Sequence, residues 1–138
     1  MAPVDIPSGF FAAGFSPGFL DRSGPYWLKP DEAGTIVGLR VEDGHLNYQT
    51  MAHGGLITTL ADVALSYCIY ASTRPSPIVA TAALTVNFLG AARLHDWLEA
   101  EARIDRMGKR LCHASGTIRR SGTTIATMSG VFSVMQGD

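Results

Sequence analysis

The feature that most constrains the fold is an apolar segment at residues 54–72. From Leu56 to Ala71 apolar side chains occupy nearly every side of the expected helix, and Asp62 is the single charged residue. A helix of this composition is buried on most of its sides. The Arg-Pro-Ser-Pro run at 74–77 predicts its end, because proline cannot continue a helix. The rest of the chain must therefore enclose one long helix.

Strand signals surround this helix on both sides. A β-branched run at 35–41 predicts one strand before it, and four later runs predict strands in a meander. These later strands are expected at residues 78–89, 97–106, 111–119 and 123–135. Ser121-Gly122 predicts a tight hairpin turn. The simplest way to bury the helix is to wrap an antiparallel sheet around it, so we predict an α+β hotdog fold with five or six strands.

Proline, glycine and phenylalanine dominate residues 1–30. We predict a short helix around residues 4–13, followed by a loop that packs its aromatic side chains onto the domain. Residues 1–30 are therefore interpreted as an N-terminal extension, and residues 31–138 as a single hotdog domain.

Composition excludes several classes of function. The chain has 138 residues, the length of one domain, and a net charge of −1, so no basic surface suggests nucleic acid or a membrane as partner. Its longest apolar stretch carries Asp62 and is shorter than a membrane span. Cys68 and Cys112 stand alone, without the spacing of a zinc site. With no secretory signal at the N-terminus, we expect a cytoplasmic protein without a metal or cofactor.

A spaced motif, Asn-x5-His-Gly-Gly-x6-Asp, consists of Asn47, His53, Gly54, Gly55 and Asp62. It resembles the motif of PaaI-type acyl-CoA thioesterases in the hotdog superfamily, and the resemblance extends over roughly residues 30–135. It implies hydrolysis of acyl-CoA to a free acid and CoA, with CoA as part of the substrate. The chain departs from the family pattern at His95, where a glycine is usual.

Two parts of the motif have clear chemical uses. A buried carboxylate such as Asp62 is costly unless it is paired or used. The resemblance implies that Asp62 acts as general base on water or as nucleophile on the thioester carbonyl. Gly54 and Gly55 begin the helix, where free N–H groups and the helix dipole can stabilise an oxyanion.

The resemblance assigns the other motif positions more specific tasks. Asn47 would polarise the carbonyl or position water, although a turn asparagine is common. His53 is expected to orient the loop or cap the helix rather than act as a base. A Ser or Thr on the strand after the helix holds the water or the acid in this family. Thr81 is the candidate here, with Thr85 as the fallback.

Substrate-binding residues are suggested at two further places. Arg106, Lys109 and Arg110 surround a turn glycine and could bind the phosphates of CoA, or form an ordinary solvated turn. Several aromatic residues could line an apolar acyl pocket, or belong to the core: Tyr67, Tyr70, Phe10, Phe11, Phe15, Phe19 and Trp27. Aryl-acetyl, short and medium acyl groups all remain open.

Helix geometry makes a prediction about assembly. Gly54 and Asp62 are eight residues apart, which is about 12 Å along one helix. Reacting groups must lie within about 3 Å of one another, so one carbonyl cannot contact both. We therefore expect a homodimer in which Gly54 of one chain faces Asp62 of the other, and we expect such dimers to pair into a dimer of dimers.

Two other functions remain as alternatives. A hotdog hydratase or dehydratase would act on enoyl- or hydroxyacyl-thioesters, but such enzymes pair histidine with an acid differently. A non-catalytic acyl-CoA-binding protein would use the same pocket without hydrolysis. The presence of Asp62 in the motif favours hydrolysis over both.

Overall fold

A computed structural model describes residues 5–32 and 34–135. The strands are β1 (Phe11–Ala12), β2 (Tyr26–Asp31), β3 (Gly34–Arg40), β4 (Ile78–Phe88), β5 (Trp97–Met107), β6 (Leu111–Arg120) and β7 (Thr123–Met135). The helices are α1 (Phe19–Ser23), the 3-10 helix η1 (Asp43–His45) and the long α2 (Gly54–Tyr70). No helix of the described residues is long and apolar enough to cross a membrane.

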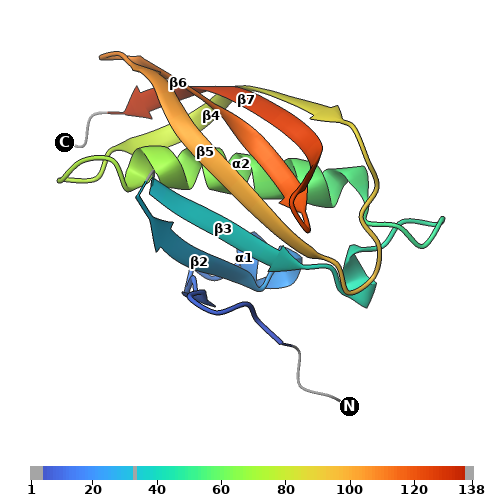
Figure 1. Cartoon of the computed structure of the whole chain (residues 1–138). Coiled ribbons are helices and arrows are strands. Elements are labelled where there is room, and N and C mark those ends of the chain that lie inside the picture. Colours follow the sequence, from blue (N-terminus) through green and yellow to red (C-terminus); the bar gives the residue numbers. More distant parts are fainter. Residues whose placement is uncertain (1–4, 33, 136–138) are drawn as a thin grey trace.

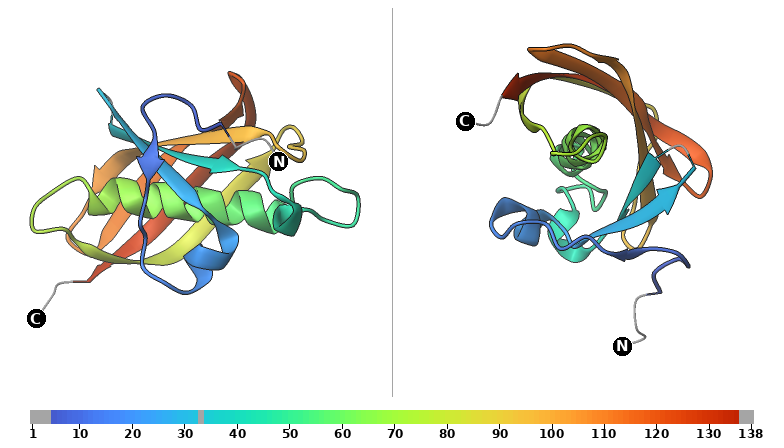
Figure 2. Two further views of the ribbon diagram at one scale, coloured as in Figure 1. Left: turned by 90° about the horizontal axis from the view of Figure 1, so that it is seen from below. Right: turned by 90° about the vertical axis from the view of Figure 1, so that its left-hand side faces the viewer.

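The strands form one antiparallel sheet that curves around α2 (Figures 1 and 2). This arrangement confirms the α+β hotdog fold. The sheet has seven strands in the order β1-β2-β3-β5-β6-β7-β4, more than the five or six expected. Each predicted strand is present to within one residue at either end, and the helix ends two residues earlier than predicted.

The N-terminal prediction was wrong in its secondary structure. Residues 5–13 contain no helix, and Phe11–Ala12 instead form β1 at the edge of the sheet. β2 was missed because Pro30 interrupts its strand signal. β1 pairs only with Trp27 and Leu28, so Pro30 has no neighbour on that side and its missing N–H disrupts no ladder there.

The predicted meander also needs correction. β5, β6 and β7 are consecutive neighbours, but β4 pairs with β7 rather than with β5. The chain therefore crosses from β4 at one edge to β5 in the middle of the sheet. This places β4 beside α2, where it brings side chains to the helix. The Ser121-Gly122 hairpin is as predicted, with φ of 48° and 80°, the backbone of a tight turn between twisted strands.

The core lies between α2 and the concave face of the sheet. Leu60, Leu65, Leu98, Ile118 and Phe132 are fully buried there. The helix is less evenly buried than its composition suggested, because one stripe along it is not covered by the sheet. The small or polar residues of this stripe are Gly55, Thr58, Thr59, Asp62 and Ser66.

Gly116 allows β5 and β6 to approach closely, and this leads to a stability prediction. A Cβ at this position would overlap the carbonyl oxygen of Glu101, which is backbone in a paired strand and cannot easily move. We expect Gly116→Ala to lower the free energy of unfolding by about 2–3 kcal/mol or more. Gly44→Ala is the matched control, since a Cβ there meets no atom within 4 Å. Urea denaturation of both variants tests this, and equal stabilities would contradict it.

Candidate active site

Asp62 is held by a hydroxyl from a neighbouring strand. Thr81 Oγ1 on β4 donates a hydrogen bond of 2.6 Å to Asp62 Oδ1 on α2. The structure therefore brings together two predicted site residues that are far apart in the sequence. Asp62 is half-buried in a single chain rather than fully buried, because it lies on the stripe of α2 that the sheet leaves uncovered.

A β-bulge in β4 explains which threonine reaches the helix. The pairing of β4 with β7 shifts register between Thr81 and Ala83. Val79 before the bulge and Leu84 after it both pack against the core. Thr81 therefore shares the inner face with Val79, whereas Thr85 alternates away from Leu84. Without the bulge, strand alternation would put Thr81 and Thr85 on the same face. With the bulge, Thr85 points away from α2 and cannot take the place of Thr81.

The N-terminus of α2 is capped by His53. Its Nδ1 accepts a hydrogen bond of 2.8 Å from the backbone N–H of Gly55. This fits the expected capping role and rules out Gly55 N–H as a free donor while the cap is formed. Within residues 5–32 and 34–135, no acceptor binds the N–H of Gly54. One free donor therefore points out of the helix start.

Asn47 is fixed by the turn that leads into α2. Its Oδ1 accepts hydrogen bonds from the N–H groups of Gln49, at 2.9 Å, and Met51, at 3.1 Å. These bonds stabilise the turn and also set the orientation of the carboxamide. Nδ2 binds no acceptor in the described part of the chain, so it remains able to donate. The observed geometry is therefore compatible both with Asn47 as a turn residue, through Oδ1, and with Asn47 as a donor, through Nδ2.

A groove of about 700 Å³ opens beside Asp62. Three segments form it: the N-terminal loop, one face of α2 and the beginning of β4. Its lining consists of Ala13, Gly14, Phe15, Ser16, Leu20, Asp62, Val63, Ser66, Tyr67, Tyr70, Pro77, Ile78 and Val79. Tyr67, which the sequence suggested as a substrate contact, is thus one of the residues that line this groove. Phe15 of the aromatic N-terminal loop, which the sequence had suggested for an acyl pocket, also lines the groove, whereas no motif singled out Leu20 or Ser66.

A second hollow of about 440 Å³ lies at the start of α2. His53, Gly55 and Thr59 line it together with Arg22 of α1. Arg22 was missed because it stands alone in a loop-rich segment with no motif around it. The start of α2 thus has a cation in its neighbourhood.

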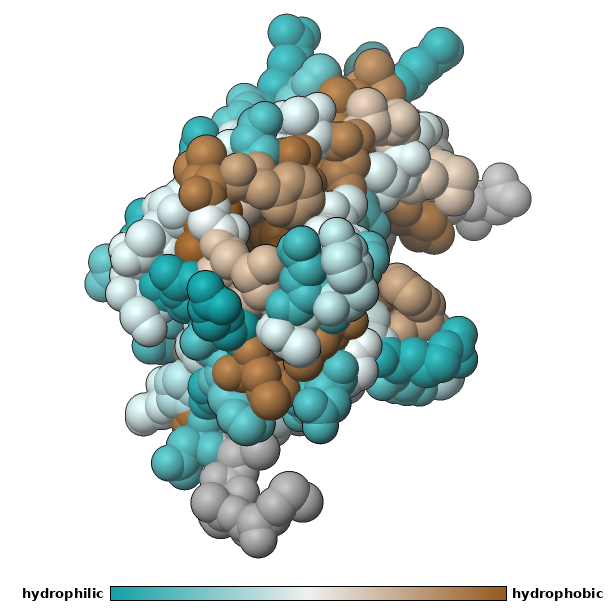
Figure 3. Space-filling model, turned by 90° about the vertical axis from the view of Figure 1, so that its right-hand side faces the viewer, coloured by the Kyte–Doolittle hydropathy of each residue, from teal (hydrophilic) through white to brown (hydrophobic). Residues whose placement is uncertain are grey.

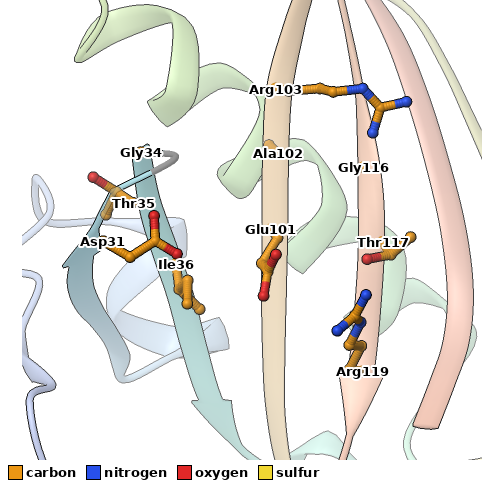
Figure 4. A pocket seen from close by; sticks show the side chains of 10 residues that line it. All are labelled: Asp31, Gly34, Thr35, Ile36, Glu101, Ala102, Arg103, Gly116, Thr117 and Arg119. Atoms are coloured by element: carbon orange, nitrogen blue, oxygen red, sulfur yellow. The ribbon is translucent and has the colours of Figure 1, made fainter. Parts of the chain in front are cut away.

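A third hollow, of about 240 Å³, lies on the outer face of the sheet (Figure 4). Glu101 and Arg103 of β5 and Thr117 and Arg119 of β6 line it, with both signs of charge mixed. None of the predicted site residues reaches it, because the sheet separates it from α2. It is therefore a less suitable centre for the chemistry than the groove beside Asp62.

The predicted phosphate-binding cations lie on the β5–β6 hairpin. Arg106, Lys109 and Arg110 are all exposed. In Figure 1 this hairpin lies toward the C-terminal end of α2, away from the start of the helix. Within one chain these cations are therefore not near the start of the helix.

Other nucleophiles and ligands are less suitable. Burial raises the pKa of both the Cys68 and Cys112 thiols, so neither is a thiolate at neutral pH. His45 is buried, where Nδ1 accepts from Glu42 N–H and Nε2 lies 3.2 Å from the Gly24 carbonyl oxygen. In the described residues no three His, Cys, Asp or Glu side chains gather as a metal site would require.

Comparison with known proteins decides the family. The model of the thioesterase superfamily matches residues 49–127. The chain belongs to this superfamily. It is 38% identical over 130 residues to "Putative esterase PA0474" of Pseudomonas aeruginosa, a match that covers 94% of this chain and 97% of that protein. In this thioesterase-superfamily chain, the residues that the superfamily model matches include α2 and the part of the motif from His53 to Asp62.

Solved structures agree with this assignment. The BH2602 protein of Bacillus halodurans, solved with CoA, is 25% identical with a TM-score of 0.73, and the match covers 80% of this chain and 74% of that one. The PaaI protein of E. coli, from the phenylacetic acid degradation operon, is 26% identical with a TM-score of 0.69. That match covers 75% of this chain and 73% of PaaI. His95, where the sequence pattern led us to expect glycine, has a φ of 73°, in the region that favours glycine.

Proposed function

We propose that this protein hydrolyses acyl-CoA thioesters to a free acid and CoA. The observation that carries the proposal is the Asp62 carboxylate, bound by Thr81 at 2.6 Å and placed at the wall of an apolar groove. A carboxylate so placed has one oxygen held and the other available for chemistry. The thioesterase superfamily supplies the reaction class, and the Bacillus halodurans relative was solved with CoA.

Asp62 would drive the attack on the thioester carbonyl. Its second oxygen takes a proton from water as the water attacks, or itself attacks the carbonyl carbon. The Thr81 hydroxyl orients the carboxylate for either route. In the first route the protonated Asp62 returns this proton to the departing CoA thiolate as the C–S bond breaks. In the second route the C–S bond breaks to leave an acyl–aspartyl anhydride and a CoA thiolate, and one water then supplies the proton for the thiol and the hydroxide that hydrolyses the anhydride to the free acid and the Asp62 carboxylate.

The start of α2 would stabilise the oxyanion. The free N–H of Gly54 lies at the positive end of the helix dipole, where negative charge is favoured. Asn47 Nδ2 is the second donor, held in place by the turn that its own Oδ1 stabilises. His53 would support this arrangement from the N-cap rather than exchange protons with the substrate.

The attacking carboxylate of Asp62 and the oxyanion-binding N–H of Gly54 would have to come from two chains. Gly54 and Asp62 are about 12 Å apart along α2, so an antiparallel copy of the helix would bring one chain's Gly54 to the other's Asp62. The uncovered stripe of α2 consists of small and polar residues, which allow close approach of a second helix.

The surface near the start of α2 supports the same arrangement. Hydrophobic residues gather in patches on the face shown in Figure 3. Phe88 and Leu89, at the end of β4, are 54% and 63% exposed. Exposed apolar side chains of this size are typical of surfaces that a partner covers. We therefore propose a homodimer with two composite sites.

Arg106, Lys109 and Arg110 are proposed to bind the phosphates of CoA. They are exposed cations on a hairpin close to the C-terminal end of α2. In the antiparallel dimer, where the partner's Gly54 faces Asp62, the C-terminal end of α2 at Tyr70 lies about 12 Å further along the helix. CoA could then reach from the composite site to the hairpin.

A direct assay tests the proposed activity. We expect the purified protein to release free thiol from acyl-CoA, measured with a thiol-reactive dye, and not to hydrate crotonyl-CoA, measured by loss of the enoyl absorbance. Hydration without thiol release would favour the hydratase alternative. Binding of acyl-CoA without either reaction would favour a non-catalytic binding protein and contradict the proposal.

A further inference from the structure

We infer that the groove beside Asp62 binds an extended apolar acyl group of medium length, and that Phe15 and Tyr70 set this preference. The inference rests on the proposed thioesterase function and adds the substrate class to it. No motif predicts this preference, because the groove is assembled from three segments that are distant in the sequence.

The groove has a polar end and an apolar run along the helix. Asp62, Ser66 and Tyr70 line it at intervals of four residues, so they lie along one side of α2. Asp62 and Tyr70 are about 12 Å apart along the helix axis. A carbonyl at Asp62 would therefore direct its acyl group along α2 toward Tyr70.

Aromatic rings form the wall of this run. The Phe15 ring lies 5.6 Å from the Tyr67 ring, and the Tyr67 ring lies 6.0 Å from the Tyr70 ring, measured between centroids. Phe15 also packs against Tyr26 at 5.9 Å, which ties the N-terminal loop to the sheet. Aromatic rings at these separations make a continuous apolar surface.

The groove is large and partly uncovered. Its volume of about 700 Å³ is in the usual range for small-molecule sites, and an acetyl group would leave most of it unfilled. Tyr70 is 52% exposed and Ile78 is 55% exposed, although both line the groove. A longer acyl group would remove this apolar surface from water, and each buried methylene favours binding about fourfold.

Non-hydrolysable CoA thioethers test the inference without relying on catalysis. By titration calorimetry we expect S-octyl-CoA to bind at least ~100-fold more tightly than S-ethyl-CoA, because several methylenes become buried. An S-(2-phenylethyl)-CoA arm distinguishes an aryl group from an aliphatic chain. Stronger binding of the phenylethyl than of the octyl thioether would overturn the preference for an extended chain.

Variants of the groove residues test whether the groove causes the preference for the longer acyl group. Phe15→Ala and Tyr70→Ala should each reduce the octyl-to-ethyl ratio about tenfold, with S-ethyl-CoA binding little changed. Phe11→Ala is the matched control, since Phe11 is an exposed aromatic residue of β1 outside the groove lining. Phe15→Leu serves as the milder variant if the alanine substitution impairs folding, and it should give a smaller reduction in the same direction.

Two further results would overturn the inference, and both differ from failure of the proposed function. Equal affinity of the wild-type protein for the ethyl and octyl thioethers would show that the groove does not bind the acyl group. An unchanged octyl-to-ethyl affinity ratio in folded Phe15→Ala and Tyr70→Ala variants would show that these two residues do not set the preference. Absence of thiol release from any acyl-CoA, with the thioether preference intact, would instead contradict hydrolysis alone.

Discussion

Asp62→Asn is expected to lower kcat for thioester hydrolysis by about 10²–10⁴-fold, the usual contribution of a general base. The substitution keeps the shape of the side chain and an oxygen that can accept the Thr81 hydrogen bond. It removes the negative charge that takes the proton or attacks the carbonyl. Thiol release under saturating acyl-CoA measures the effect, and substrate binding should change far less.

Asp105→Asn is the control for the same chemical change. Asp105 forms an exposed ion pair with Arg103 at 3.3 Å, and such surface pairs contribute about 1 kcal/mol or less. This variant should retain wild-type turnover. A folded Asp62→Asn protein with near-normal kcat would exclude Asp62 from the reaction.

Thr81 offers a check on how Asp62 is held. Thr81→Ala removes the hydroxyl that donates to Asp62, whereas Thr81→Ser keeps it. We expect roughly a tenfold or greater loss of kcat for the alanine variant, in line with a hydrogen bond to a charged group, and recovery in the serine variant. Equal losses in both would point to packing of the threonine methyl group instead.

Mixing two inactive variants is expected to restore about a quarter of the wild-type activity. The pair is Asp62→Asn and Asn47→Asp, where the second keeps the Oδ1 acceptor that holds the turn and loses the Nδ2 donor. In a mixed dimer one composite site receives both wild-type residues and the other receives neither. With random pairing, half of the dimers are mixed and each has one intact site.

The measurement requires subunit exchange by unfolding and refolding the variants together, with native mass spectrometry to confirm mixed dimers. Each variant refolded alone is the control and should stay inactive. If mixed dimers form but activity does not return, each site lies within one chain. A fully active monomer would likewise contradict the composite site.

The secondary structure was predictable where side-chain pattern is local. An apolar helix and strands with alternating burial show their period in consecutive residues, so α2 and β3–β7 could be located within one or two residues. β2 was not predicted, because a proline such as Pro30 fits in a strand only where no neighbouring strand needs its N–H, and here β1 does not extend to Pro30. That condition depends on the neighbouring strand and not on β2 itself.

The sequence by itself determined that one long helix had to be enclosed and that Gly54 and Asp62 stand about 12 Å apart on it. Both follow from the composition and pitch of a single helix. Only the tertiary structure decided that Thr81 binds Asp62, because a bulge in β4 sets the face of that threonine. It also decided that Phe15 packs against Tyr67, since the path of an irregular loop depends on the surface that it covers. Contacts between distant segments depend on strand register and sheet curvature, which no local pattern specifies.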